Sequence, residues 1–89
     1  MRNDITALAI EPDHAVLKNG EAVQLNLYAR TKRAGTDLIP GTMAAWSSDD
    51  NRVGEVNGQG RLTARGAGLV TITASYADRQ VTSVFTVVD

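Results

Sequence analysis

The feature that most constrains the fold of this chain is an alternation of apolar and polar residues with a period of two. The alternation is clearest over residues 21–30. The apolar members of that stretch stand at its odd positions, Val23, Leu25, Leu27 and Ala29. Successive side chains of a β-strand point to opposite faces of its sheet. The stretch therefore predicts a strand with one face toward a core and the other toward water.

The same pattern returns in short segments along the chain. Further strands are predicted at residues 5–10, 14–17, 42–48, 53–57, 61–64, 69–76 and 81–88. Glycine-containing turns separate many of them, and residues 31–41 are predicted to form a polar loop whose Leu38 and Ile39 begin the next strand. About seven short antiparallel strands at such intervals, with no helical periodicity, are typical of an all-β sandwich of two sheets or a small barrel.

The last predicted strand allows two registers. Val81, Phe85 and Val87 would share an inward face in one of them, and Val84 and Val88 would do so in the other. We favour the first register because it buries more apolar side chains.

Length and composition exclude several classes of protein. The 89 residues suit one domain, residues 1–89, and the net charge of −1 gives no electrostatic reason to expect nucleic-acid binding. The chain has no cysteine, which excludes disulfides and thiolate metal sites. No segment is apolar for the ~20 residues of a membrane span, and Met1 to Ile10 does not read as a signal peptide. We therefore expect no membrane insertion, and expect that an exported form would be a piece of a longer protein.

A set of short motifs in the second half of the chain is more specific. They are Ala45-Trp46-Ser47-Ser48, Val53-Gly54-Glu55-Val56, Gly58-Gln59-Gly60-Arg61-Leu62-Thr63-Ala64, Gly66-Ala67-Gly68 and Val70-Thr71-Ile72-Thr73-Ala74. In this order, and with Gly20-Glu21 before the strand at 21–30, they resemble the bacterial immunoglobulin-like domain, group 2. The chain departs from that pattern at Gly54, where the family usually has alanine, and its loop at 31–41 is closer to the invasin-type domains.

The resemblance implies an immunoglobulin-like β-sandwich with no catalytic residues and no cofactor. Such modules occur in adhesin and invasin- or intimin-like stalks, in phage tail, capsid and fibre proteins, and beside carbohydrate-active enzymes. The expected function is a structural or adhesive module on a cell surface or virion, with other domains of its parent protein as partners. The alternative is a module that binds a carbohydrate or a receptor.

The alternation and the resemblance together predict a core. Trp46 is expected to fill the space between the two sheets, because its indole is the largest side chain in a chain with few aromatic residues. The predicted core residues are Leu25, Leu27, Trp46, Val56, Leu62, Val70, Ile72 and Phe85.

The sequence offers little for catalysis or metal binding. His14 is the only histidine, and no Gly-x-Ser-x-Gly motif supplies a nucleophile for it. The acidic turn at 49–51, with Glu55 nearby, lacks the ligand spacing of a calcium loop, and Asp and Asn are equally expected as turn formers. The glycine pairs at 58–60 and 66–68 precede no helix and are interpreted as turns, not as phosphate loops. We expect no enzyme and no metal.

One stretch is a candidate binding surface. Tyr28, Arg30, Lys32 and Arg33 combine an aromatic ring with the strongest local cluster of positive charge. By alternation Tyr28 points away from the apolar face of its strand, so a glycan or receptor could reach it. A solvated loop without a ligand is the simpler interpretation.

Overall fold

The computed structural model describes residues 5–32 and 35–89. Within them the chain forms ten strands and one short 3-10 turn: β1 (Ile5–Glu11), β2 (Val16–Lys18), β3 (Ala22–Gln24), β4 (Asn26–Thr31), β5 (Gly35–Ile39), η1 (Gly41–Met43), β6 (Ala45–Ser48), β7 (Gly54–Val56), β8 (Arg61–Ala64), β9 (Gly68–Tyr76) and β10 (Arg79–Val88).

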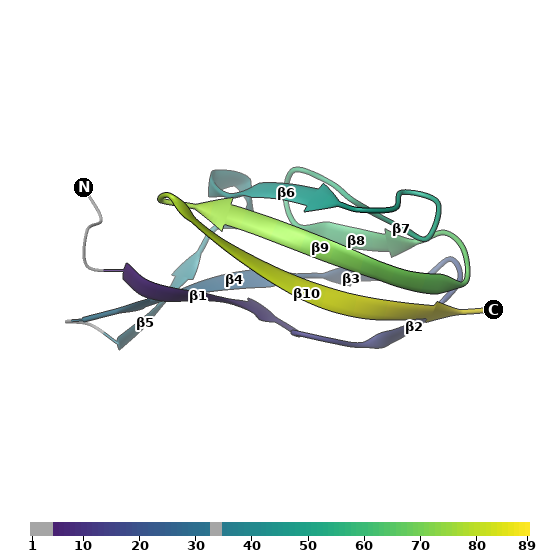
Figure 1. Ribbon diagram of the computed structural model, residues 1–89, viewed down its shortest axis with the longest axis horizontal. Helices are drawn as coiled ribbons and strands as arrows, with labels where there is room; N and C mark the ends of the chain where they lie inside the picture. The colour runs from purple at the N-terminus through teal and green to yellow at the C-terminus, as the bar shows by residue number, and fades with distance from the viewer. Residues whose placement is uncertain (1–4, 33–34) are drawn as a thin grey trace.

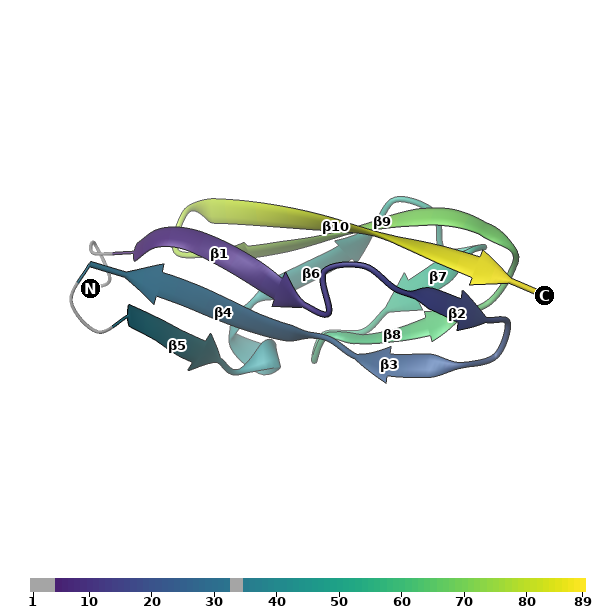
Figure 2. The ribbon, with the colours of Figure 1, turned by 90° about the horizontal axis from the view of Figure 1, so that it is seen from below.

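The strands make an elongated sandwich of 43 × 17 × 16 Å (Figure 1). One layer is the four-stranded sheet β2-β10-β9-β6. The three-stranded sheets β1-β4-β5 and β3-β8-β7 lie end to end in the other layer, and β3 leads into β4 where they meet (Figure 2). The start of β1 and the end of β10 lie at opposite ends of the long axis (Figures 1 and 2). The prediction of an all-β sandwich is therefore confirmed.

The predicted number of strands is wrong, because one predicted strand serves two sheets and the segment predicted as a loop contains a strand of its own. The stretch at 21–30 divides at Leu25, whose N–H donates to the carbonyl of Gly60 (2.8 Å). On one side of this break β3 pairs with β8, and on the other side β4 pairs with β1 and β5. Ten strands in three hydrogen-bonded sheets thus replace the predicted seven in two.

Two further predictions need correction. The segment predicted as a loop at 31–41 contains β5, which pairs antiparallel with β4, so Leu38 and Ile39 end a strand and do not begin one. Not all pairs are antiparallel either. After β1 the chain passes Pro12 into the other layer, and β2 then runs parallel to β10, with Leu17 opposite Val87.

The core lies between the two layers. It contains Ile5, Ile10, Leu17, Leu25, Leu27, Ala29, Ile39, Val53, Leu62, Ala64, Val70, Ile72, Ala74, Phe85 and Val87. The last strand turns Ser83, Phe85 and Val87 inward and leaves Val84 and Val88 exposed, which is the register that the sequence favours.

Trp46 and Val56 belong to the rim of this core and are only partly buried. Trp46 is only partly buried because its strand, β6, is the edge of its sheet and pairs only with β9. The indole lies between the layers at this edge and not at the centre of the core. Its Nε1 donates to the carbonyl of Gly41 (2.8 Å), and its ring lies against Gly60, which directly precedes β8 of the other layer.

Gly54, where the sequence departs from the motif it resembles, lies under two core side chains. A Cβ on Gly54 would stand 3.1 Å from both Leu62 Cδ1 and Val70 Cγ1. The branched side chains of this core therefore occupy the space that an alanine methyl would need.

Candidate functional site

The outward face of the sheet β1-β4-β5 brings together two of the residues predicted for binding. Tyr28 stands in register between Ala9 of β1 and Leu38 of β5. One pair further along, Arg30 stands between Ala7 and Thr36. Because paired residues point to the same face of a sheet, the Tyr28 ring and the Arg30 side chain project on one side of the domain.

A groove opens beside these two side chains. It has a volume of about 300 Å³ and is lined by Ala7, Leu8, Ala9, Tyr28, Arg30 and Thr36. We call it the Tyr28 groove. A neighbouring hollow of about 450 Å³ shares Ala9, Tyr28, Arg30 and Thr36 with it and extends to Glu11. The groove exists because the methyl groups of two alanines stand beside a much larger aromatic ring.

The charges around the groove are positive at one end. Arg30 is exposed, and no described side chain forms an ion pair or hydrogen bond with its guanidinium group. Lys32 is exposed in the turn that follows β4. Arg33, the fourth predicted residue, lies outside the described residues. The sequence does not predict that Ala7, Ala9 and Thr36 line this surface, because only the pairing of β1 and β5 with β4 brings them to this face.

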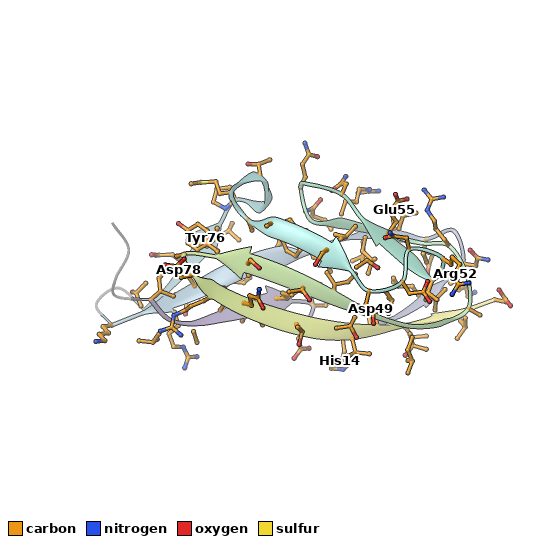
Figure 3. All side chains as sticks on the ribbon, turned by 45° about the horizontal axis from the view of Figure 1, so that its top comes forward. His14, Asp49, Arg52, Glu55, Tyr76 and Asp78 are labelled. Carbon is orange, nitrogen blue, oxygen red and sulfur yellow. The ribbon has the colours of Figure 1, made fainter. Side chains whose placement is uncertain are left out.

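A larger hollow lies at the hairpin between β9 and β10. Its volume is about 750 Å³ and its lining is Met43, Ala45, Ser75, Tyr76, Ala77, Asp78, Arg79 and Gln80. Figure 3 shows Tyr76 and Asp78 at this end of the domain, away from Arg52 and Glu55. The hairpin turn has two non-glycine residues with positive φ, Ala77 at 51° and Asp78 at 66°. Its lining places the Tyr76 ring beside the oppositely charged side chains of Asp78 and Arg79, and the residues predicted for binding, Tyr28 and Arg30, do not line it.

His14 is in no catalytic arrangement with the described residues. Its Nδ1 lies 2.8 Å from Asp13 Oδ1, and the two side chains are 85% and 73% exposed. A catalytic histidine needs a nucleophile within hydrogen-bond reach, and none of the described hydroxyl groups hydrogen-bonds to this imidazole. The contact is a surface pair between neighbouring residues.

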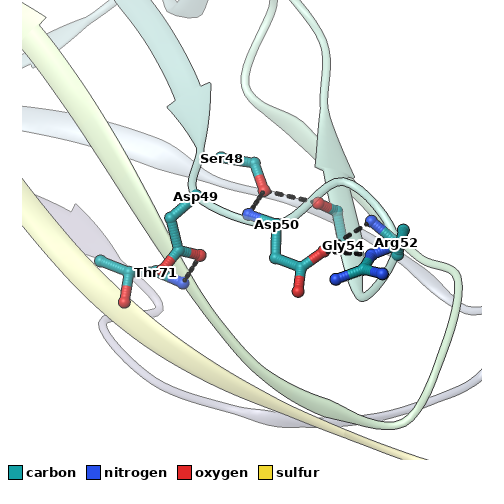
Figure 4. Close-up of polar contacts among 6 residues, drawn as sticks. All are labelled: Ser48, Asp49, Asp50, Arg52, Gly54 and Thr71. Atoms are coloured by element: carbon teal, nitrogen blue, oxygen red, sulfur yellow. Dashed lines mark hydrogen bonds and ion pairs between the residues drawn. The ribbon is translucent and has the colours of Figure 1, made fainter.

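The acidic turn after β6 uses its oxygen atoms on its own backbone (Figure 4). The Ser48 hydroxyl donates to the carbonyl of Gly54 (2.6 Å) and accepts from the Asp50 N–H (3.2 Å). Asp50 Oδ1 accepts from the Arg52 N–H (3.0 Å) and lies 3.4 Å from Arg52 Nε. These bonds close the turn and explain its residues without a ligand.

Asp49 extends the ladder between β6 and β9. Its N–H donates to the carbonyl of Thr71 (3.1 Å), and its Oδ1 accepts from the Thr71 N–H (2.9 Å). The carboxylate thus stands where a strand would offer a backbone carbonyl. Over residues 5–32 and 35–89, no three His, Asp or Glu side chains gather as a metal site. The only helical segment described there, η1, is far too short to cross a membrane.

Comparisons with known proteins agree on the fold. The profile of a family described as bacterial Ig-like domain (group 2) matches residues 4–86. A search of curated proteins finds no match. Among solved structures, domains 4 and 5 of the S-layer protein SbsC superpose with a TM-score of 0.75 at 16% identity, over 96% of this chain and 53% of that one. A mutant of intimin from EHEC O157:H7 superposes with a TM-score of 0.67 at 16% identity, over 92% of this chain and 46% of that one.

The chain thus spans about half the length of these solved fragments. At such low identity the likeness shows the fold alone. That fold is the immunoglobulin-like sandwich that the sequence predicts.

Proposed function

Because the chain belongs to the bacterial Ig-like domain (group 2) family, we propose that it is a non-catalytic structural module that keeps its two ends apart and transmits tension between them. In this proposal the domain is part of a longer protein on a bacterial cell surface, and its partners are the neighbouring parts of that protein. Two of the similar solved structures are fragments of one S-layer protein, SbsC, which supports the cell surface over a virion.

The observation behind the proposal is the position of the first and last strands. The chain enters at one end of the long axis and leaves at the other (Figures 1 and 2). The strand that follows β1, β2, runs parallel to β10, with residues 16–18 paired to residues 86–88. The Thr86 N–H donates to the carbonyl of Ala15 (3.0 Å), and the Asn19 N–H donates to the carbonyl of Val88 (2.8 Å).

This arrangement determines how tension would act. A pull on the two chain ends draws β2 and β10 past each other along their common direction. The inter-strand hydrogen bonds are then loaded together, and several must break at once before the strands separate. A pull that peels two strands from one end breaks the bonds one after another and needs less force. A spacer under tension is therefore expected to resist a pull through its ends more than a pull at one end.

Single-molecule pulling in two directions tests the proposal. The chain has no cysteine, so single cysteines can be introduced as attachment points. One variant is pulled through Thr6→Cys and Asp89→Cys, at opposite ends, and the other through Thr6→Cys and Asp78→Cys, both near the β9–β10 hairpin end. We expect a clearly higher mean unfolding force through the opposite ends. Equal forces in the two directions would argue against a tension-transmitting spacer.

A further inference from the structure

We infer that the Tyr28 groove binds a sugar residue that carries a carboxylate. This goes beyond the spacer function and does not depend on it. The groove combines a hollow, an aromatic ring and a cation that pairs with no described side chain, and unlike the hollow at the β9–β10 hairpin its lining includes no carboxylate. Its volume of about 300 Å³ lies at the lower end of the range for small-molecule sites, which suits one sugar unit better than a long peptide.

The position of Tyr28 presents its ring beside the groove. The side chain is half-buried on the middle strand of its sheet, between Ala9 on one neighbouring strand and Leu38 on the other. Leu38 is 59% exposed and widens the apolar surface next to the ring. An aromatic ring held in this way offers an apolar body together with a hydroxyl group at low cost in conformational entropy. Both properties match a sugar, whose ring has an apolar C–H face and a rim of hydroxyl groups.

The polar groups of the groove favour a negative charge on that sugar. The guanidinium group of Arg30 presents donors in a plane that fits a carboxylate with two parallel hydrogen bonds. No described side chain already pairs with it, so a ligand carboxylate would displace no internal partner. Thr36 lines the same groove and can donate to or accept from a sugar hydroxyl.

An extended polyanion is a poorer occupant. The exposed cations described near the groove are Arg30 in its lining and Lys32 in the turn after β4, and the chain as a whole has a net charge of −1. Nucleic-acid binding depends on several phosphate contacts made together. An acidic peptide could also pair with Arg30, but it has no rigid C–H face to place on the Tyr28 ring. The experiment therefore includes such a peptide.

The test is a titration of the ¹⁵N-labelled domain followed by NMR chemical-shift changes. Glucuronate and glucose form a matched pair, because they differ only at C6, where glucuronate has a carboxylate and glucose a hydroxymethyl group. A tetraglutamate peptide represents the other occupant. We expect glucuronate to shift amide signals of β1, β4 and β5 around the groove, with a Kd on the order of 1 mM. We expect glucose to bind at least about tenfold more weakly, a difference typical of a charge-assisted hydrogen bond.

Three variants separate binding from folding. Arg30→Gln keeps an exposed polar side chain and should weaken glucuronate binding about tenfold while leaving glucose binding unchanged. Ala9→Leu, at an exposed position, should block both sugars by filling the groove without removing a core residue. Arg79→Gln alters an exposed arginine outside the groove and should leave both affinities as they are.

The outcomes are distinct. Groove-centred shifts that Arg30→Gln and Ala9→Leu reduce, and Arg79→Gln does not, support the site. Equal affinities for glucose and glucuronate would overturn the role of the carboxylate. No shift by either sugar at about ten times the expected Kd, or shifts by tetraglutamate alone, would overturn the sugar site.

Discussion

Replacement of Gly60 by alanine should destabilise the domain by about 2–4 kcal/mol, a large share of the total for a chain of this size. Gly60 lies where the turn after β7 meets the edge strand β6. Its φ is +84°, and its carbonyl accepts the Leu25 N–H that divides the long strand into β3 and β4. A methyl group there affects the backbone conformation and the Trp46 contact together.

The magnitude follows from two local effects. A left-handed backbone costs a non-glycine residue about 1–2 kcal/mol, which the lower entropy of the unfolded alanine chain partly offsets. The new Cβ would also lie 2.7 Å from Trp46 Cζ2 and 2.9 Å from Cε2, well inside the separation that carbon atoms prefer. The indole cannot retreat freely, because its Nε1 donates to the Gly41 carbonyl. Overpacking of this kind costs about 1–3 kcal/mol.

Urea unfolding followed by tryptophan fluorescence measures the free energy of unfolding, since Trp46 is the only tryptophan. Two other glycines act as matched controls. Gly20 has a φ of +95° with no atom within 4 Å of its would-be Cβ, so Gly20→Ala reports the backbone cost alone. Gly58 has open space and no left-handed φ, so Gly58→Ala should be within about 0.5 kcal/mol of the parent chain or slightly more stable.

The expected order of destabilisation is Gly60→Ala, then Gly20→Ala, then Gly58→Ala. If Gly60→Ala and Gly20→Ala cost the same, the indole does not press on Gly60, and the account of Trp46 as the closure of the sheet edge is wrong.

Three further substitutions test other contacts. Asp49→Ala should lower the free energy of unfolding by about 1 kcal/mol, because it removes the acceptor for the Thr71 N–H. Asp49→Asn keeps an oxygen atom there and should cost less than half of that. Equal losses of stability in urea unfolding would contradict this role. The double change Ala77→Asn and Asp78→Gly should stabilise the domain by about 1 kcal/mol and raise its Tm by about 4–8 °C, because both positions of the β9–β10 turn have positive φ. A lower Tm in calorimetry would contradict this prediction. Trp46→Phe should cost about 1–3 kcal/mol in thermal unfolding through the lost indole hydrogen bond and the smaller ring, and an unchanged Tm would show that the rim contact adds nothing.

The sequence predicts faces well because alternation is a local property. Leu25, Leu27 and Ala29 are all at most 1% exposed, as expected from their odd positions in one stretch. The strand at Arg61–Ala64 has the predicted limits, because glycine turns and a short apolar run mark both of its ends. In the last strand, a count of apolar residues was enough to favour the observed register.

Pairing could not be predicted in the same way, because it depends on residues far apart in the chain. The division at Leu25 requires Gly60, 35 positions later, to accept its N–H. The Tyr28 groove likewise depends on Ala9 and Thr36. These residues lie beside Tyr28 and Arg30 only because their strands, β1 and β5, pair with β4. The sequence could place an aromatic and a basic residue on one face. It could not show that small side chains leave a hollow beside them.

The most direct test of the central claim is the unfolding force of an Asn19→Pro variant pulled through its two ends. Asn19 is the second residue of a turn closed by the Glu21 N–H and the Lys18 carbonyl (2.9 Å), with Gly20 at φ +95°. A turn of this type accepts proline at its second position, but proline cannot donate to the Val88 carbonyl. The lost hydrogen bond and the lower entropy of the unfolded chain are expected to offset each other to within about 1 kcal/mol.

The account therefore predicts nearly unchanged stability in urea, together with a lower mean unfolding force through the ends and an unchanged force when the domain is pulled at one end. An end-to-end force equal to that of the parent chain would contradict the claim that β2 and β10 transmit tension across the domain.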